Sequence, residues 1–214
     1  MTGRLGGWLA LVGAVAALGY ASRISGGRPE RDVLYEWHVA VGNFVQYGII
    51  LALVLVLARG RPRELLALRP PASWKRAAAI ATGVLVGIYA LGVALEPLLH
   101  AGREQGLTPP GWDGNRAPAF AANAVAIAVV APIVEELLFR GVGFSLLERF
   151  GSAAAILGVG LAFGLWHGLV YALPVLAAFG AGLAYLRSRT GSVYPCIALH
   201  GTFNAIALGA AIAT

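Results

Sequence analysis

Charged residues are scarce in this sequence, and cysteine is nearly absent. Only 12% of the 214 residues are charged and 58% are hydrophobic, whereas soluble domains carry roughly 25% charged residues. The single cysteine, Cys196, excludes an intrachain disulfide, and no segment alternates in the way that a membrane β-strand needs. With a mean hydropathy of +0.75, the composition predicts an all-α fold, a polytopic bundle of membrane helices that forms a single domain over residues 1–214.

Apolar stretches predict about seven transmembrane helices, since a span needs ~20 apolar residues to cross the bilayer core. They are Leu5–Ala21, Val39–Ala58, Ala77–Leu99, Ala117–Leu138, Ser152–Ala172, Leu173–Leu186 and Ser192–Ala213. The sixth is short and contains Pro174, so it could be tilted, re-entrant or continuous with the fifth. The first resembles a secretory signal with a small-residue cleavage site at Gly19-Tyr20-Ala21; cleavage there would leave six spans.

Basic residues divide unevenly between the two sides of the predicted bundle. The side with the N-terminus holds eleven: Arg4, Arg59, Arg61, Arg63, Arg69, Lys75, Arg76, Arg140, Arg149, Arg187 and Arg189. The other side holds five: Arg23, Arg28, Arg31, Arg103 and Arg116. The net charge of +6 therefore reflects orientation and not nucleic-acid binding. The positive-inside rule predicts a multi-pass plasma-membrane protein with a cytoplasmic N-terminus, an external C-terminus, the basic loop 59–76 on the cytoplasmic face and an irregular external loop 100–118.

Two adjacent acids stand at the end of the predicted fourth span, although a charge at the bilayer centre costs roughly 2.5–3.5 kcal/mol. Pro132 is expected to kink the helix one turn before Glu135 and Glu136. Arg140 follows Glu136 by four residues, so these two side chains share a helix face and can pair. Glu135 is rotated from Glu136 by about 100°, has no partner nearby in the sequence and is available for another role.

Histidines lie inside two other predicted spans. His167 is in the fifth span, and His200 shares one helix face with Asn204 in the last. Each residue alone could hold helices together by a hydrogen bond. Carboxylates and imidazoles on three spans, however, form the composition of a water-activating site, with or without a metal ion. Glu135, His167, His200 and Asn204 are therefore predicted to act together.

Other polar residues in the spans have simpler interpretations. Asn43, Gln46 and Asn123 are expected to be interhelical hydrogen-bond partners rather than substrate contacts. Cys196 shares the helix face of His200 and could be a nucleophile, but a small packing residue is the expected role.

Four short motifs resemble the signature of the CPBP family of intramembrane proteases. They are E-E-x-x-x-R at 135–140, F-x-x-x-H at 163–167, F-x-x-G at 179–182 and H-x-x-x-N at 200–204. That family includes the CAAX prenyl endopeptidases of the Rce1 type and the bacterial Abi and bacteriocin-processing proteins. The motifs occur in family order over about a third of the chain, so the resemblance divides it into N-terminal spans (1–116) and a catalytic core bundle (117–213).

The resemblance implies an endopeptidase that hydrolyses a peptide bond within the membrane. The implied catalytic set is Glu135, Glu136, His167, His200 and Asn204. Glu135 would be the general base that activates water, assisted by His167. His200 and Asn204 would stabilise the oxyanion that develops on the substrate.

Supporting roles and metal dependence follow from the same resemblance. Glu136 with Arg140 would fix the helix and tune Glu135, and Phe163 would be a further supporting residue. Family members have been described both as metalloproteases and as glutamate-dependent enzymes without a catalytic metal. The ligands of a zinc ion would be Glu135, His167 and His200. The sequence has no H-E-x-x-H pair to supply two ligands from one helix, which favours the metal-free mechanism.

Unequal depths of the site residues put the predicted span limits in doubt. Counted from the cytoplasmic ends of their spans, Glu135 and His167 differ in depth by roughly 15 Å or more at 1.5 Å per residue. The fourth helix is therefore expected to extend past Arg140 towards Gly151, and the fifth is expected to begin nearer Leu157.

Two other functions fit parts of the pattern. A non-catalytic immunity or scaffold protein could keep this fold, although it would be expected to have lost one of Glu135, His167 or His200. A proton-coupled transporter could use the acids and histidines as a relay, although the sequence has no inverted repeat. For a protease, the expected substrate is a peptide or protein that enters from the membrane, and the Gly-, Ala- and Arg-rich composition suggests a bacterial chain.

Overall fold

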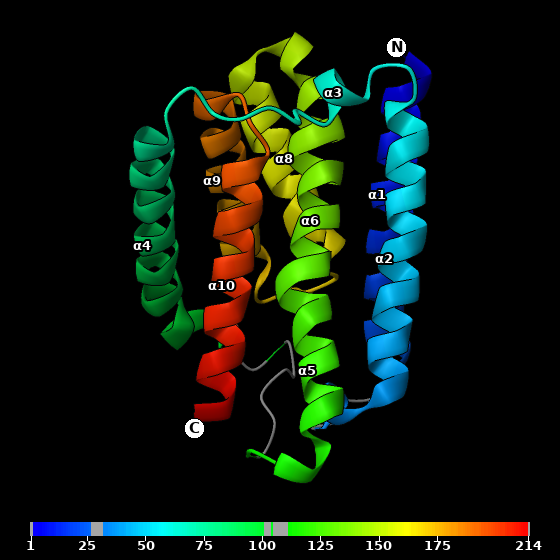
Figure 1. Ribbon diagram of the computed structural model, residues 1–214, viewed down its shortest axis with the longest axis vertical. Coiled ribbons are helices and arrows are strands. Elements are labelled where there is room, and N and C mark those ends of the chain that lie inside the picture. The colour runs from blue at the N-terminus through cyan, green and yellow to red at the C-terminus, as the bar shows by residue number, and fades with distance from the viewer. Residues whose placement is uncertain (1, 27–31, 101–103, 105–110, 214) are drawn as a thin grey trace.

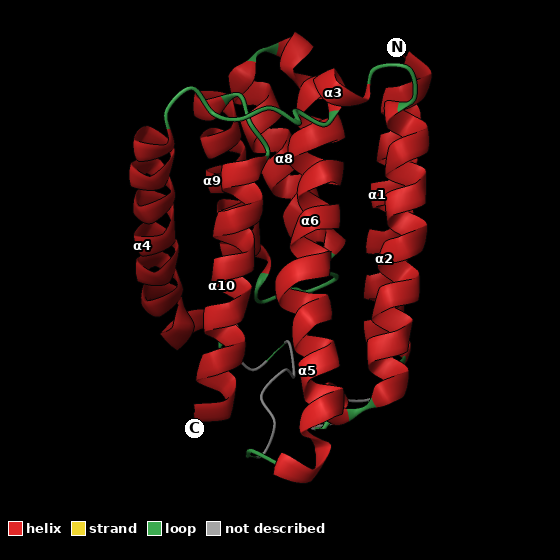
Figure 2. Cartoon of the chain, in the orientation of Figure 1, coloured by secondary structure: helices red, strands yellow, loops and turns green. Residues whose placement is uncertain are grey.

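The computed structural model describes residues 2–26, 32–100, 104 and 111–213, and over these ranges the chain forms helices and no strands (Figure 2). Within them, seven helical rods form one bundle (Figure 1). They are α1 (Thr2–Ser25), α2 (Trp37–Ala58), α4 (Trp74–Leu99), a composite helix that begins with α5 (Ala117–Val125), α8 (Ser152–Trp166), α9 (Leu173–Thr190) and α10 (Tyr194–Ala213). Among the described residues, five helical stretches are long and apolar enough to cross a membrane. The predicted all-α membrane bundle is confirmed.

The composite helix carries both acids and changes helical type along its length. After α5 it continues as a π-helical segment at Ala126–Val130, α6 (Ala131–Glu136), a second π-helical segment at Leu137–Gly143, α7 (Phe144–Leu147) and a 3₁₀ turn at Glu148–Phe150. π-Helical turns are rare and frequently lie at functional sites. Because the helix runs to Phe150, the predicted extension of the fourth span past Arg140 is confirmed.

The fifth and sixth spans differ from their predicted limits. α8 begins at Ser152, two residues after the composite helix ends at Phe150, and only Gly151 lies between them, so the expected start near Leu157 is wrong. It ends at Trp166 and not at Ala172, because the chain turns directly after it. The short sixth stretch is a separate helix, α9, with Pro174 in its first turn, where a missing N–H breaks no helical hydrogen bond.

The first residues of α1 and the last residues of α10 lie at opposite ends of the bundle, as the predicted topology requires (Figure 1). Two residues counted as loop charges, Arg140 and Arg187, are instead buried in the bundle, with exposed fractions of 0% and 4%. Nine basic residues remain assigned to the side with the N-terminus, which is still more than the five assigned to the opposite side. Of those five, Arg28, Arg31 and Arg103 lie outside the described residues, as do residues 101–103 and 105–110 of the predicted loop 100–118. Which end faces the cytoplasm stays a prediction.

Part of the predicted cytoplasmic loop is also buried. Leu65, the last residue of the short helix α3 (Pro62–Leu65), and the two residues after it, Leu66 and Ala67, pack into the end of the bundle. Gly141 of the composite helix makes room for them, because a Cβ there would lie 3.0 Å from the Leu66 Cα. Loop 59–76 is therefore anchored to the helix that carries the acids.

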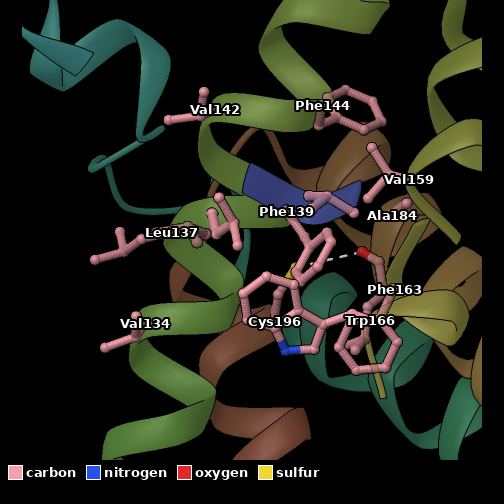
Figure 3. Close-up of a cluster of buried hydrophobic side chains, with 14 of the residues drawn as sticks. Val134, Leu137, Phe139, Val142, Phe144, Val159, Phe163, Trp166, Ala184 and Cys196 are labelled. Atoms are coloured by element: carbon pink, nitrogen blue, oxygen red, sulfur yellow. Dashed lines mark hydrogen bonds between the residues drawn. The ribbon is translucent and has the colours of Figure 1, made fainter. Parts of the chain in front are cut away.

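Aromatic residues from α1, the composite helix and α8 form the centre of the core. Figure 3 shows Phe139 of the composite helix beside Phe163 and Trp166 of α8. Phe139 contacts Trp8, Phe163 and Trp166 edge to face, with ring centroids 5.4 to 6.4 Å apart. A Cβ on Gly143 would lie 2.5 Å from the Trp8 ring, so only glycine allows this approach. α1 is thereby packed directly against the helix that carries the acids.

The polar residues with simpler interpretations mostly behave as expected. Cys196 is fully buried, and its thiol donates a weak hydrogen bond to the Leu183 carbonyl at 3.4 Å (Figure 3), which supports a packing role. Asn43 Nδ2 donates to Asn123 Oδ1 at 3.4 Å and so links α2 to α5. Gln46 is exposed on α2 and lines the cavity described below.

Candidate active site

The predicted site residues come from three rods and meet at one level of the bundle. They are Glu135 and Glu136 at the end of α6, His167 directly after α8, and His200 and Asn204 on α10. Glu135 precedes Gly151 by sixteen residues, and His167 follows it by sixteen. Because both neighbouring rods run into that reversal, the two residues reach similar depths. The expected difference in depth therefore disappears once the fourth helix is given its full length.

Glu136 connects two basic side chains through a single oxygen. Its Oε1 accepts a hydrogen bond from Arg140 Nη1 at 2.9 Å and lies 2.9 Å from His200 Nδ1. A carboxylate that already pairs with arginine acts as an acceptor, so the His200 nitrogen facing it carries the proton. Arg140 Nη2 also donates to the Gly180 carbonyl at 2.9 Å. The predicted Glu136–Arg140 pair forms as expected, whereas the contact with His200 was not predicted.

Glu135 uses its two oxygens differently. Its Oε1 accepts a hydrogen bond from the Tyr47 hydroxyl of α2 at 2.9 Å. Its Oε2 faces His200 Nε2 at 3.9 Å, which is too long for a direct hydrogen bond. The residue is 3% exposed and lines the cavity. Glu135 is thus held at one oxygen and directed towards an imidazole at the other.

His167 has its tautomer fixed by its own helix. Its Nδ1 lies 2.7 Å from the Phe163 carbonyl, which only accepts, so Nδ1 carries the proton. In the neutral ring, Nε2 is then a lone-pair acceptor. The Phe163 ring contacts both imidazoles, with its centroid 4.7 Å from that of His167 and 5.5 Å from that of His200. The Arg140 guanidinium carbon lies 4.5 Å from the same centroid. Phe163 therefore packs between the site and the buried ion pair.

The turn after His167, residues 168–172, is fastened from two directions. Tyr20 and Arg23 of α1 each donate a hydrogen bond to one of its carbonyl groups, at 3.1 and 2.9 Å. The Glu104 carboxylate accepts hydrogen bonds from two of its N–H groups, at 2.7 and 2.8 Å. The position of His167 therefore depends on residues far from it in the sequence.

Asn204 is tied to the first π-helical segment. Its Nδ2 donates to the Ile127 carbonyl at 2.8 Å. Pro132 has no N–H to bond the Ala128 carbonyl, and Gly201 of α10 packs against that carbonyl, where a Cβ would lie only 2.8 Å away. The expected kink before the acids is therefore a π-helical turn whose carbonyl groups face α10.

The second π-helical segment is also held by partners from other helices. The Trp8 indole N–H donates to the Leu138 carbonyl at 3.0 Å, and Arg187 Nε donates to the Arg140 carbonyl at 3.2 Å. Side chains of α1 and α9 thereby satisfy carbonyl groups that a regular helix would bond internally. The two acids lie between π-helical segments that distant residues stabilise.

A cavity of about 1060 Å³ opens onto this site. Its polar lining includes Glu135, His167, His200, Asn204 and Tyr47. Glu136 and Arg140 lie behind it and do not line it. Most other lining residues are apolar, and several on α2 are also exposed on the outer surface: Val45, Ile49 and Leu53, at 56%, 58% and 42%. The cavity therefore reaches the face that lipid would cover.

The zinc-ligand set is not assembled. Over residues 2–26, 32–100, 104 and 111–213, no three His, Cys, Asp or Glu side chains gather closely enough to hold a metal ion. The set considered from the sequence was Glu135, His167 and His200.

Tyr47 is the site residue that sequence reasoning missed. It lies on the face of α2 that also carries the buried residues Ile50 and Val54. A tyrosine on such a face must direct its hydroxyl towards a polar partner inside the bundle. That position is the signal that could have identified it.

The fold and the site define a polytopic helical membrane protein with a buried acid–histidine centre. Residues 117–206 match the family model described as type II CAAX prenyl endopeptidase Rce1-like. Over these residues the chain is similar to that family, and the resemblance expected from the motifs is confirmed. At family level this supports an intramembrane endopeptidase of the CAAX-protease type. No curated protein and no solved structure matches the chain.

Proposed function

We propose that the protein hydrolyses a peptide bond within the membrane, with water activated by Glu135. The observation that carries the proposal is the meeting of the Glu135 carboxylate with two imidazoles, those of His167 and His200, at one lipid-facing cavity. This arrangement joins a base to hydrogen-bonding groups at a site where Glu135 and His200 are almost fully buried.

Glu135 would take a proton from the attacking water through Oε2. His167 Nε2 would accept the second hydrogen bond of that water, since its Nδ1 proton is bound to the Phe163 carbonyl. The water oxygen would then bond to the peptide carbonyl carbon. The peptide C–N bond breaks as Glu135 passes the proton to the leaving nitrogen.

His200 and Asn204 would stabilise the negative charge on the former carbonyl oxygen. For this role His200 must carry a proton on Nε2 as well as on Nδ1, the nitrogen that faces the Glu136 carboxylate. Asn204 uses one amide N–H for the Ile127 carbonyl and has a second to donate. Glu135 and His167 would thus contact the oxygen that comes from water, and His200 and Asn204 would contact the former carbonyl oxygen.

The proposed substrate is a peptide or protein segment that enters from the lipid phase. Exposed apolar residues of α2 continue into the cavity lining, so an apolar segment would keep favourable contacts along this route. Placement in the plasma membrane, with the N-terminus in the cytoplasm, is part of the same proposal.

Cleavage of a library of quenched fluorescent peptides by the protein in liposomes tests the function. We expect wild type to cleave a subset, Glu135→Gln to cleave none, and the exposed control Glu64→Gln to match wild type. Turnover retained in Glu135→Gln would contradict the mechanism. Glu135-dependent proton flux without cleavage would favour a transporter, and neither activity would favour a non-catalytic protein. Comparing membrane proteomes of cells that carry wild type or Glu135→Gln would then identify substrates.

A further inference from the structure

The N-terminal spans contribute a polar group to the site. Tyr47 of α2 lies well outside residues 117–206, which match the protease family. Its hydroxyl donates to Glu135 Oε1 at 2.9 Å, and its half-buried side chain lines the cavity. This is the one hydrogen bond from a side chain to Glu135 among the described residues.

The direction of Tyr47 is set by the packing of α2. Ala40, Ile50, Val54 and Ala58 are 0–4% exposed and mark the buried face of this helix. Tyr47 precedes Ile50 by three residues and Val54 by seven, so it lies on that face. Its hydroxyl is therefore directed at the composite helix by a rigid, 22-residue helix and not by a loop.

A glutamate carboxylate turns easily, because the torsion that ends its side chain has a broad distribution. A single strong donor on one oxygen removes much of that freedom. With Oε1 bonded to Tyr47, Oε2 is the oxygen that faces His200 Nε2. The two oxygens are therefore no longer equivalent.

We propose that Tyr47 is a positioning residue for hydrolysis, which holds Oε1 of Glu135 so that Oε2 receives the proton of water. Tyr47 acts through Glu135 and makes no bond to the reacting atoms. The proposal rests on the proposed function for its kinetic consequence. The hydrogen bond itself can be tested without substrate.

Tyr47→Phe separates this role from simple packing, because phenylalanine keeps the ring and removes the hydroxyl. With a peptide that wild type cleaves, we expect kcat to fall roughly 10- to 100-fold, as for a misplaced catalytic group, with KM unchanged. The unfolding temperature should fall by only a few degrees, about the effect of one lost hydrogen bond. The control is Tyr89→Phe, whose ring packs on Phe203 at 5.6 Å and whose helix, α4, contributes no residue to the cavity; its kcat should match wild type.

Isotope-edited infrared spectroscopy provides the second readout. The Glu135 carboxylate band is identified as the one lost in Glu135→Gln. We expect Tyr47→Phe to shift this band and Tyr89→Phe to leave it in place. An unmoved band in Tyr47→Phe overturns the proposal whatever the kinetics, and a shifted band with unchanged kcat overturns the positioning role. Failure of the proposed function is seen separately, as equal cleavage by wild type and Glu135→Gln.

Discussion

His200 Nδ1 lies 2.9 Å from Glu136 Oε1, the oxygen that also accepts a hydrogen bond from Arg140. Glu136 and Arg140 are fully buried and do not line the cavity. Glu136 therefore acts on the site through His200, while Arg140 neutralises its charge. The same contact joins the composite helix to α10, so stability and site geometry depend on one carboxylate.

Glu136→Gln should destabilise the fold strongly, because it leaves the buried Arg140 charge without its carboxylate. We expect the free energy of unfolding in detergent micelles to fall by roughly 3–5 kcal/mol. Glu64→Gln is the matched control, since Glu64 pairs with Arg61 on the exposed surface at 3.2 Å and such pairs contribute about 0–1 kcal/mol. Equally small losses in both variants would contradict a structural role for the buried pair.

Gly168→Ala tests whether the turn after His167 must keep its shape. Gly168 has φ +61°, and a Cβ there would lie 2.8 Å from the Gly19 carbonyl carbon. We expect a loss of roughly 1–3 kcal/mol in unfolding free energy and slower peptide cleavage, because the turn and His167 must shift. Gly13 lies on α1, the helix that carries Gly19, and a Cβ at Gly13 meets no atom within 4 Å. Gly13→Ala should therefore be neutral or slightly stabilising. Indistinguishable behaviour of the two variants would show that the turn is not constrained.

Hydropathy and helical spacing were sufficient to predict the bundle and much of the site. The pairing of Glu136 with Arg140 follows from a spacing of four residues on one helix. The contact between Glu136 and His200 could not be predicted, because it depends on how far α10 is shifted along α6. That shift is set by packing between rods and leaves no periodic signal in either sequence segment.

The π-helical segments and the buried arginines show a second limit of prediction from the sequence. The carbonyl of Leu138 is satisfied by Trp8, 130 residues earlier in the chain, and no local pattern reports such a partner. Arg140 and Arg187 looked like loop charges because each follows an apolar stretch, yet both are buried. Tyr47 was missed for the opposite reason, since a tyrosine in an apolar helix is usually explained by its ring.

Asn204→Ala should separate transition-state stabilisation from helix packing. If Asn204 donates to the oxyanion, kcat should fall by roughly 10²–10³, the usual effect of removing one such donor, measured with a cleaved peptide in liposomes. Loss of the bond to the Ile127 carbonyl should cost only about 1 kcal/mol of stability. Thr202→Ala, an exposed position on the same helix, should leave both quantities unchanged. A lower stability with an unchanged kcat would restrict Asn204 to holding the π-helical segment.

Removal of divalent metal is expected to leave peptide cleavage intact. The carboxylate of Glu135 is bound to Tyr47, and one nitrogen of each imidazole is bound to an oxygen of the protein, Glu136 Oε1 for His200 and the Phe163 carbonyl for His167. A zinc ion at Glu135, His167 and His200 would need all three side chains to converge within about 2.0–2.2 Å of one point. The measurement is cleavage after dialysis against a strong chelator, with metal content determined on the same sample. Activity that is lost on chelation and restored by one equivalent of zinc would show that the three side chains do converge, and the role of Glu135 would change from base to ligand.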